Sequence, residues 1–225
     1  MTELHLYQLA DVYYRYSPHK KTDEYDKWVS YKSRFKNSIA GDYVESTTRK
    51  QDMRVLSHVV EQHAGNTPID PDVITVHVRV GDVIDGDVHE PETLIDKQCT
   101  YSLYGNKKWA QYVKPWAYFE EQLKYQPDHI KDIQIITGGI FLDADPSLIN
   151  NTDMWTKSKK YLDLLVQRME HAGYNVRYTL PSHDTHPDED FIRLFRCKHL
   201  IITGGRFAEL ALNVNKYSHE HQTES

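Results

Sequence analysis

Four short apolar runs alternate with amphipathic segments over the last two thirds of the chain. The runs are rich in β-branched residues and lie at 73–80, 133–137, 175–180 and 199–203. Between and after them, apolar residues recur at helical spacing, which predicts helices at 116–125, 156–171, 187–196 and 206–215. Strands that alternate with helices are typical of a parallel sheet. We therefore predict an α/β domain over residues 71–215, a Rossmann-like parallel sheet with helices on both faces and its ligand at the carboxyl edge.

The first seventy residues have a different pattern, with many tyrosines and charged residues. Apolar positions recur at helical spacing between Arg49 and His63, which predicts a helix there, and the turn-forming residues 67–72 mark a boundary. The aromatic residues suit the packing of a small layer better than an acceptor-binding platform. We expect a short α-rich region at 1–70, which a reduced acceptor domain would also fit, and a polar tail at 216–225.

Composition narrows the class of protein. The 225 residues carry a net charge of −6, with 27% charged and 39% hydrophobic residues, which is typical of a soluble enzyme or binding protein. No long Lys/Arg block is present, so we expect no nucleic-acid surface, although a nucleotide would need only local positive charge. The start of the chain has no apolar leader, no run is long enough to span a bilayer, and Cys99 and Cys197 are far apart. We expect a cytoplasmic protein without a membrane anchor or disulfides, and the sequence does not indicate its oligomeric state.

Polar side chains gather at the carboxyl end of the first predicted strand. His77 and Arg79 are two positions apart, so an extended strand projects them from the same face, and Asp82 follows after Gly81. In α/β sheets this edge faces the crevice where ligands bind. The arginine fork matches a phosphate group, and a neighbouring histidine can hydrogen-bond a sugar or a base. The pattern predicts a nucleotide site, and an edge strand with solvated polar residues is the alternative.

A second segment with the same chemistry follows the last predicted strand, at Thr203-Gly204-Gly205-Arg206-Phe207. Glycines there let the backbone approach a ligand closely, and the free amides at the start of a helix favour an anion. Arg206 adds a positive charge, so that Arg79 and Arg206 together suit a pyrophosphate leaving group. Taken alone, Gly204-Gly205 is as consistent with a simple tight turn.

Residues 85–115 show no regular pattern and begin beside His77 and Arg79. A long irregular stretch in a compact domain is usually functional, so we expect an active-site loop or lid, with disorder as the alternative. The run His183–Asp188 has metal-binding residue types, but its loose spacing favours a solvated loop. Neither a Walker loop nor a Gly-x-Ser-x-Gly elbow occurs, and no Asp-x-Asp in a strand-end setting suggests a bound divalent ion. We expect no metal site and no metal cofactor.

The first polar segment, His77-Val78-Arg79-Val80-Gly81-Asp82, resembles the His-x-Arg-x-Gly-Asp motif of the superfamily of α1,2-, α1,6- and protein O-fucosyltransferases. Residues 190–207, which end in Gly204-Gly205-Arg206-Phe207, resemble the carboxyl-terminal motif of the same superfamily. The resemblance covers about residues 72–215. It implies a GT-B-type, metal-independent inverting transferase that uses GDP-fucose as donor and a glycan or protein as acceptor.

The resemblance also implies roles for individual residues. Arg79 would hold the β-phosphate and stabilise departing GDP, His77 would contact the nucleoside, and the turn at 204–207 would wrap the pyrophosphate. The family usually has hydroxyl residues just before the phenylalanine, whereas this chain has Gly205 and Arg206. Direct displacement at the anomeric carbon would need a general base. Asp82 is the nearest candidate, and a cap for the turn is an equally good interpretation of it.

Two other functions fit the same residues. One is a transferase that uses a different nucleotide sugar at the same site. The other is a non-catalytic nucleotide-sugar-binding protein that has kept the pocket and lost the acceptor domain. Turnover of the donor in the presence of an acceptor distinguishes the second alternative from either enzyme, and competition among nucleotides distinguishes the two enzymes.

Overall fold

The computed structural model describes residues 57, 60–61, 70–85, 87–97, 111–137, 156–178 and 187–222. The contacts within the chain divide it into two compact units. One contains the sheet, and the other contains the last two helices.

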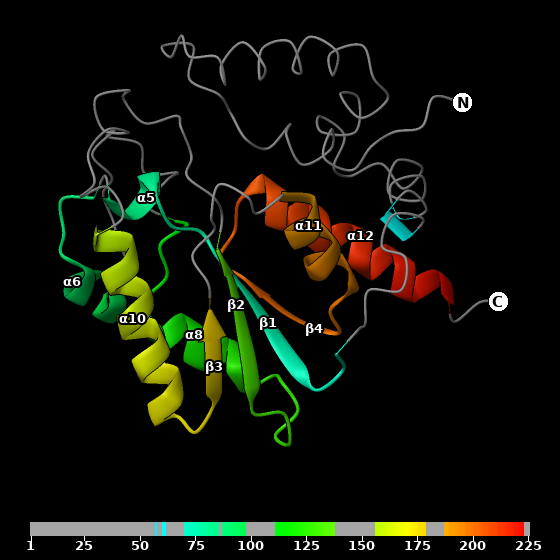
Figure 1. Cartoon of the computed structure of the whole chain (residues 1–225), viewed down its shortest axis with the longest axis horizontal. Coiled ribbons are helices and arrows are strands. Elements are labelled where there is room, and N and C mark those ends of the chain that lie inside the picture. Colours follow the sequence, from blue (N-terminus) through cyan, green and yellow to red (C-terminus); the bar gives the residue numbers. More distant parts are fainter. Residues whose placement is uncertain are drawn as a thin grey trace, which may run out of the picture. The chain divides into compact units, whose positions relative to one another are not determined.

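Within the described residues, four parallel strands form one sheet, as the alternating pattern predicts (Figure 1). They are β1 (Val73–Val78), β2 (Asp132–Thr137), β3 (Asn175–Tyr178) and β4 (His199–Ile202), in the spatial order β3-β2-β1-β4. The central strand β1 is buried at every position, which explains its β-branched and almost continuously apolar sequence. Its register runs from Val73↔Asp132 to Val78↔Thr137 with β2 and from Ile74↔His199 to His77↔Ile202 with β4.

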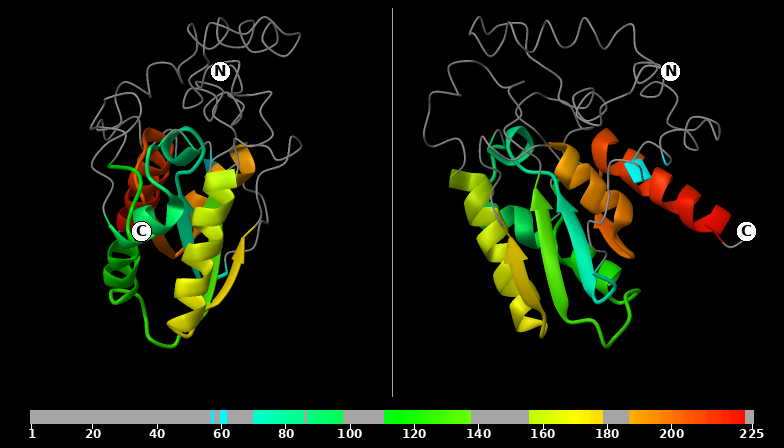
Figure 2. Two further views of the ribbon diagram at one scale, coloured as in Figure 1. Left: turned by 90° about the vertical axis from the view of Figure 1, so that its left-hand side faces the viewer. Right: turned by 45° about the vertical axis from the view of Figure 1, so that its right-hand side comes forward.

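Among the described residues, four helices belong to the same unit as the sheet: α5 (Asp82–Asp85), α6 (Pro91–Asp96), α8 (Trp116–Leu123) and α10 (Thr156–His171). Both views of Figure 2 show α10 running alongside β3. A single hydrophobic core joins the helices to the sheet. Alternate strand residues face it, and its largest fully buried members are aromatic or branched aliphatic: Tyr161, Phe119, Ile74, Ile84, Leu94, Ile95, Ile133, Ile135 and Leu162.

The second unit includes α11 (Pro187–Arg196) and α12 (Arg206–Gln222), which pack against each other. The side-chain amide of Asn215 on α12 donates a hydrogen bond to the carbonyl oxygen of Phe195 on α11. The predicted end of the last helix at Asn215 is wrong, because α12 continues to Gln222. Residues 216–222 are polar but contain no glycine or proline, so nothing in them ends a helix.

The other sequence expectations agree with the structure to differing degrees. The predicted helices at 156–171 and 187–196 have the observed bounds, and the helix predicted at 116–125 ends at Leu123. The stretch 85–115 is not irregular throughout, because α6 forms within it. Pro91 occupies the first turn of α6, where proline is well tolerated, so it begins this helix and does not interrupt one. Of the helix predicted at 49–63, the three described residues are helical.

In the described part of the chain, no helix combines the length and the apolar character that crossing a bilayer requires.

Candidate functional site

The two polar segments singled out in the sequence meet where β1 and β4 end. The backbone amide of Arg79 donates to Oγ1 of Thr203 over 3.0 Å, although the two residues are 124 positions apart. The amide of Thr203 in turn donates to the carbonyl oxygen of His77 over 3.1 Å. Thr203 is 2% exposed, so both hydrogen bonds lie in a protected environment. The backbone that follows each strand is therefore tied to the backbone that follows its neighbour.

The side chain of Arg79 lies against a tyrosine and a glycine. Its guanidinium carbon is 5.3 Å from the centre of the Tyr112 ring, a cation–π distance. A Cβ atom built at Gly205 would lie 3.7 Å from Cδ of Arg79 and 3.9 Å from one of its terminal nitrogens. Gly205 also has a φ of +95°, which a residue with a side chain rarely adopts. We call His77, Arg79, Tyr112, Thr203 and Gly205 the Arg79 cluster.

His77 contributes a neutral imidazole to the Arg79 cluster. Its side chain is 4% exposed. Burial, and then the positive charge of Arg79, lower the pKa of His77 from 6.5 to about 4. The ring is therefore uncharged at neutral pH, with one nitrogen that donates and one that accepts a hydrogen bond. Such a ring suits hydrogen bonding to a ligand better than it suits charge stabilisation.

The neighbouring strand ends in a buried hydroxyl group. Thr137 is the last residue of β2 and pairs in register with Val78. It is 2% exposed, and its Oγ1 atom has no hydrogen-bond partner within the described structure. Buried hydroxyl groups in proteins are normally hydrogen-bonded, so this one is an open position at the carboxyl end of the strands.

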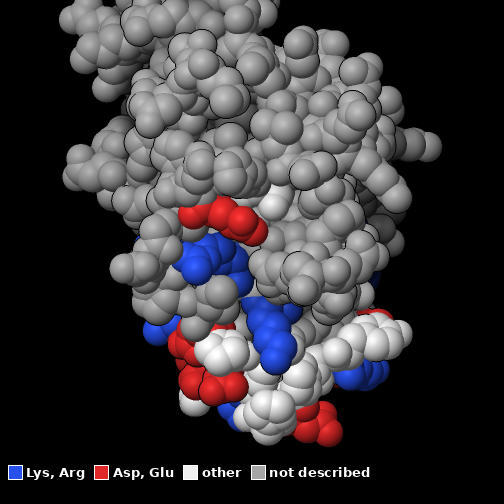
Figure 3. Space-filling view, turned by 90° about the vertical axis from the view of Figure 1, so that its right-hand side faces the viewer, with Lys and Arg blue, Asp and Glu red and all other residues white. Residues whose placement is uncertain are grey.

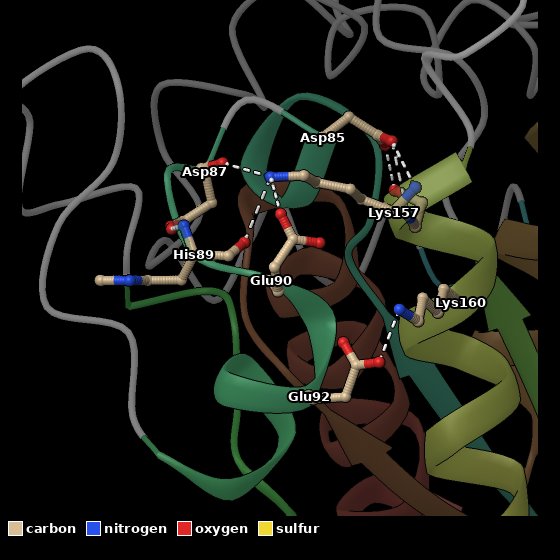
Figure 4. A network of polar contacts seen from close by, with 8 residues as sticks. Asp85, Asp87, His89, Glu90, Glu92, Lys157 and Lys160 are labelled. Carbon is tan, nitrogen blue, oxygen red and sulfur yellow. Dashed lines mark hydrogen bonds and ion pairs between the residues drawn. The ribbon is translucent and has the colours of Figure 1, made fainter.

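The amino end of α10 offers a second place for an anion, but the chain fills it with its own carboxylate (Figure 4). Oδ1 of Asp85 accepts hydrogen bonds from the backbone amides of Lys157 and Ser158, over 3.2 and 3.3 Å. The Ser158 hydroxyl donates to the other oxygen of Asp85 and itself accepts from the amide of Gly81 over 2.8 Å. This arrangement caps a helix with a residue from another element, because the first amides of a helix have no partner within it. We call it the α10 cap.

Further polar contacts hold the segment around α6 against α10. Lys157 Nζ donates to the carbonyl oxygens of Asp87 and His89, over 2.9 and 3.3 Å, and lies 3.5 Å from the Glu90 carboxylate (Figure 4). Burial raises the pKa of Asp85 above its usual value, and its hydrogen bonds to Ser158 and Lys157 offset part of that rise. Asp85 therefore serves the packing of α5 on α10.

The structure gives different amounts of information on the predicted site residues. His77, Arg79, Thr203 and Gly205 come together as described above, and Gly204 precedes Gly205 with a φ of +115°. Asp82 opens α5, and Arg206 and Phe207 open α12, but their side chains lie outside the described structure. Residues 183–186, considered above as metal ligands, also lie outside it. Among the described residues, no group of three or more His, Cys, Asp or Glu side chains is placed to hold a metal ion.

Sequence reasoning missed Tyr112, Thr137 and Asp85. Tyr112 lies in the segment before α8, which has no periodic pattern that could single it out. Thr137 ends an apolar run and carries no motif of its own. Asp85 caps a helix that begins more than seventy residues later, as the separation of 73 positions from Ser158 shows. The strand-end position of Thr137 was the one usable signal, because the ends of parallel strands meet at one edge.

Two surface features bear on where a ligand could bind. A hollow of about 270 Å³ lies at the amino ends of β1, β2 and β3, lined by Asp70, Val73, Asp132, Ile133, Asn175, Val176 and Arg177. This edge is opposite to the carboxyl edge, at which ligands of parallel α/β sheets bind. On the face drawn in Figure 3, the described Lys and Arg side chains lie beside Asp and Glu side chains. Among the described residues on that face the charges are mixed (Figure 3), unlike the single-sign surface that favours nucleic acid.

No protein-family model, no curated protein and no solved structure matches this chain.

Proposed function

We propose that this protein is a glycosyltransferase that transfers fucose from GDP-fucose to a glycan or protein acceptor by metal-independent inverting displacement. The observation that carries the proposal is the hydrogen bond from the Arg79 amide to Thr203, together with the contact between the Arg79 side chain and Gly205. The two segments that resemble the fucosyltransferase motifs are thereby neighbours in space. They lie at the carboxyl ends of two adjacent parallel strands, where this class of sheet binds ligands.

In the proposed reaction, an acceptor hydroxyl oxygen forms a bond to the anomeric carbon of fucose while the bond from that carbon to the GDP oxygen breaks. Negative charge develops on the β-phosphate of the leaving group. Arg79 stabilises this charge with its guanidinium fork, and the backbone amides of Gly204 and Gly205 add hydrogen-bond donors. The neutral His77 ring hydrogen-bonds the nucleoside part of the donor. Asp82 is the proposed general base that takes the acceptor proton.

The departure from the family motif at Gly205 has a physical explanation that is consistent with the proposal. The positive φ of Gly205 disfavours a side chain at this position. A Cβ atom at this position would already be in van der Waals contact with the Arg79 side chain. A glycine therefore lets Arg79 lie against the turn, and the arginine can supply the phosphate contact that a hydroxyl group supplies elsewhere.

The proposal is tested by calorimetry with GDP, UDP, CDP and GDP-fucose in the presence of a chelator. We expect GDP and GDP-fucose to bind without metal and more tightly than UDP or CDP. Tight binding of UDP or CDP in preference to GDP would indicate a transferase with another donor. GDP-fucose is then incubated with a panel of glycan and peptide acceptors, and GDP release is measured. Binding without any transfer would indicate the non-catalytic alternative, and no nucleotide binding at all would contradict the proposal.

A further inference from the structure

Tyr112 is the aromatic partner of Arg79, and no feature of the sequence assigns it a role. Its ring centre is 5.3 Å from the guanidinium carbon. The Tyr112 side chain is half-buried and packs against the hydrophobic core, which restricts the movement of its ring. The cation–π contact therefore joins Arg79, a candidate functional residue, to a side chain that packs against the core.

The segment that carries Tyr112 is tied down on two sides. The Tyr161 hydroxyl on α10 donates to the carbonyl oxygen of Lys114, two residues after Tyr112. The Tyr118 hydroxyl on α8 donates to the carbonyl oxygen of Ile202, the last residue of β4. The chain between Tyr112 and Tyr118 is thus attached both to α10 and to the strand that leads into Thr203. These attachments fix the ring of Tyr112 relative to the turn at Gly204 and Gly205.

A fixed ring has a direct consequence for an arginine. The guanidinium group is planar, and it binds a phosphate with two parallel hydrogen bonds only when its plane is correctly oriented. A free arginine side chain samples many rotamers, and a ligand must select one of them at a cost in affinity. An aromatic face that already holds the guanidinium removes part of that cost.

We propose that Tyr112 is a positioning residue that orients the Arg79 guanidinium toward the diphosphate group of the donor. This inference rests on the proposed function. It makes the segment before α8 a part of the nucleotide-sugar site. It also states that the Tyr112 ring affects binding of the diphosphate group and not of the base or the sugar.

The test compares two substitutions that differ in one property. Tyr112→Leu keeps an apolar side chain but removes the aromatic face, whereas Tyr112→Phe keeps the face and removes the hydroxyl group. The probes are inorganic pyrophosphate and GDP, titrated by calorimetry into the full chain. We expect Tyr112→Leu to weaken both ligands by roughly tenfold, which is within the range for a desolvated cation–π contact. We expect Tyr112→Phe to restore most of that affinity.

A matched control lies at the other edge of the sheet. Tyr174 is also half-buried and packed against the core, and Lys131 Nζ lies 5.1 Å from its ring centre. The two residues immediately precede β3 and β2, at the amino ends of the strands. Tyr174→Leu removes the same kind of contact from the same core, so it reports the effect of lost packing alone. We expect it to leave pyrophosphate affinity unchanged.

A second set of variants separates positioning from general damage. In an Arg79→Gln background, measured at millimolar pyrophosphate, we expect Tyr112→Leu to change affinity by less than about twofold, because the effects of coupled residues are not additive. An equal loss of pyrophosphate affinity from Tyr112→Leu in the wild-type and Arg79→Gln backgrounds would overturn the inference. So would a Tyr112→Phe variant that binds as weakly as Tyr112→Leu. Wild-type affinity in Tyr112→Leu would overturn it as well. Failure of the wild type to bind pyrophosphate and GDP would instead overturn the proposed function, and this inference with it.

Discussion

The Arg79 cluster and the α10 cap are two places where this fold can hold an anion, and the chain treats them differently. At the α10 cap, the amides of Lys157 and Ser158 already bind the Asp85 carboxylate. At the Arg79 cluster, an arginine lies against a tyrosine ring and a glycine, beside a histidine whose pKa is depressed. The first arrangement is complete in itself and stabilises the fold. The second places one positive charge and a neutral imidazole where ligands bind in this class of sheet.

This difference shows why a helix amino end beside a parallel α/β sheet is not by itself a phosphate site. The helix dipole and free amides favour any anion, including a carboxylate of the same chain. Asp85 satisfies them from a helix only four residues long, which the cap in turn fixes to α10. A phosphate group would have to displace Asp85 from the α10 cap. We propose the Arg79 cluster as the site of the donor diphosphate, because it lies at the carboxyl ends of β1 and β4.

The largest expected effect follows from removing the cation itself. Arg79→Ala should lower turnover of GDP-fucose by roughly a hundredfold or more, the usual loss when one preorganised donor to developing charge is removed. Arg79→Lys should recover only part of the rate, because an ammonium group lacks the two-pronged fork. The turnover of both variants is measured as the initial rate of GDP release. A rate for Arg79→Ala close to that of the wild type would remove Arg79 from the mechanism.

The burial of His77 in the Arg79 cluster is tested by how the free energy of unfolding depends on pH. In the unfolded chain its ring gains a proton as the pH falls through 6.5, whereas in the folded chain its pKa is about 4. Between these values the unfolded state binds more protons, so the free energy of unfolding falls as the pH is lowered. We expect the wild type to lose on the order of 3 kcal/mol more than His77→Asn over this range. Urea denaturation at a series of pH values measures the free energy of unfolding of both proteins. The same pH dependence in the wild type and in His77→Asn would contradict the lowered pKa of His77.

At the α10 cap, the expected effect is on stability. Asp85→Ala leaves two backbone amides and the Ser158 hydroxyl without their carboxylate, so the free energy of unfolding should fall by about 2 kcal/mol. Glu92→Ala is the control, because it removes a neighbouring ion pair with Lys160 whose side chains are half-exposed, and no measurable loss is expected. Equal stability of the two variants would show that the α10 cap does not stabilise the fold.

The smallest expected effect concerns the open hydroxyl group at the end of β2. Thr137→Val replaces a buried, unpartnered hydroxyl with a methyl group of similar shape, so stability should rise by about 1 kcal/mol. Thr75→Val is the matched control, since Thr75 is also buried in the sheet but is hydrogen-bonded to Cys197. We expect no gain from that change. A loss of stability in Thr137→Val equal to that in Thr75→Val would show that its hydroxyl is satisfied after all.

The sequence predicted those parts of the fold that depend on local pattern. The continuous apolar run of β1 and the periodic apolar stripe of α10 are strong local patterns, and both elements appear where they were expected. The stretch 85–115 was expected to be irregular, but α6 begins at Pro91 within it, because proline is well tolerated in the first turn of a helix. The end of α12 was set too early, because its last turns are polar and carry no apolar stripe.

The candidate site could be predicted only where the topology of the parallel sheet brings its residues together. His77, Arg79 and Thr203 all lie at strand ends, and parallel strands bring their carboxyl ends to one edge, so their meeting follows from the sheet alone. Tyr112 and Asp85 reach their partners through tertiary packing. The position of Tyr112 depends on how the segment before α8 is held by Tyr161 on α10, and that of Asp85 on how α5 lies against α10. No local pattern specifies either arrangement.

The most direct test of the central claim is GDP binding measured side by side in Arg79→Ala and Asp85→Ala by calorimetry. The account predicts that Arg79→Ala weakens GDP by roughly thirtyfold or more, as for other truncated charge contacts to a buried partner. It predicts that Asp85→Ala binds GDP as the wild type does, despite its lower stability. Loss of GDP affinity in Asp85→Ala together with wild-type affinity in Arg79→Ala would place the anion at the amino end of α10 and contradict the account.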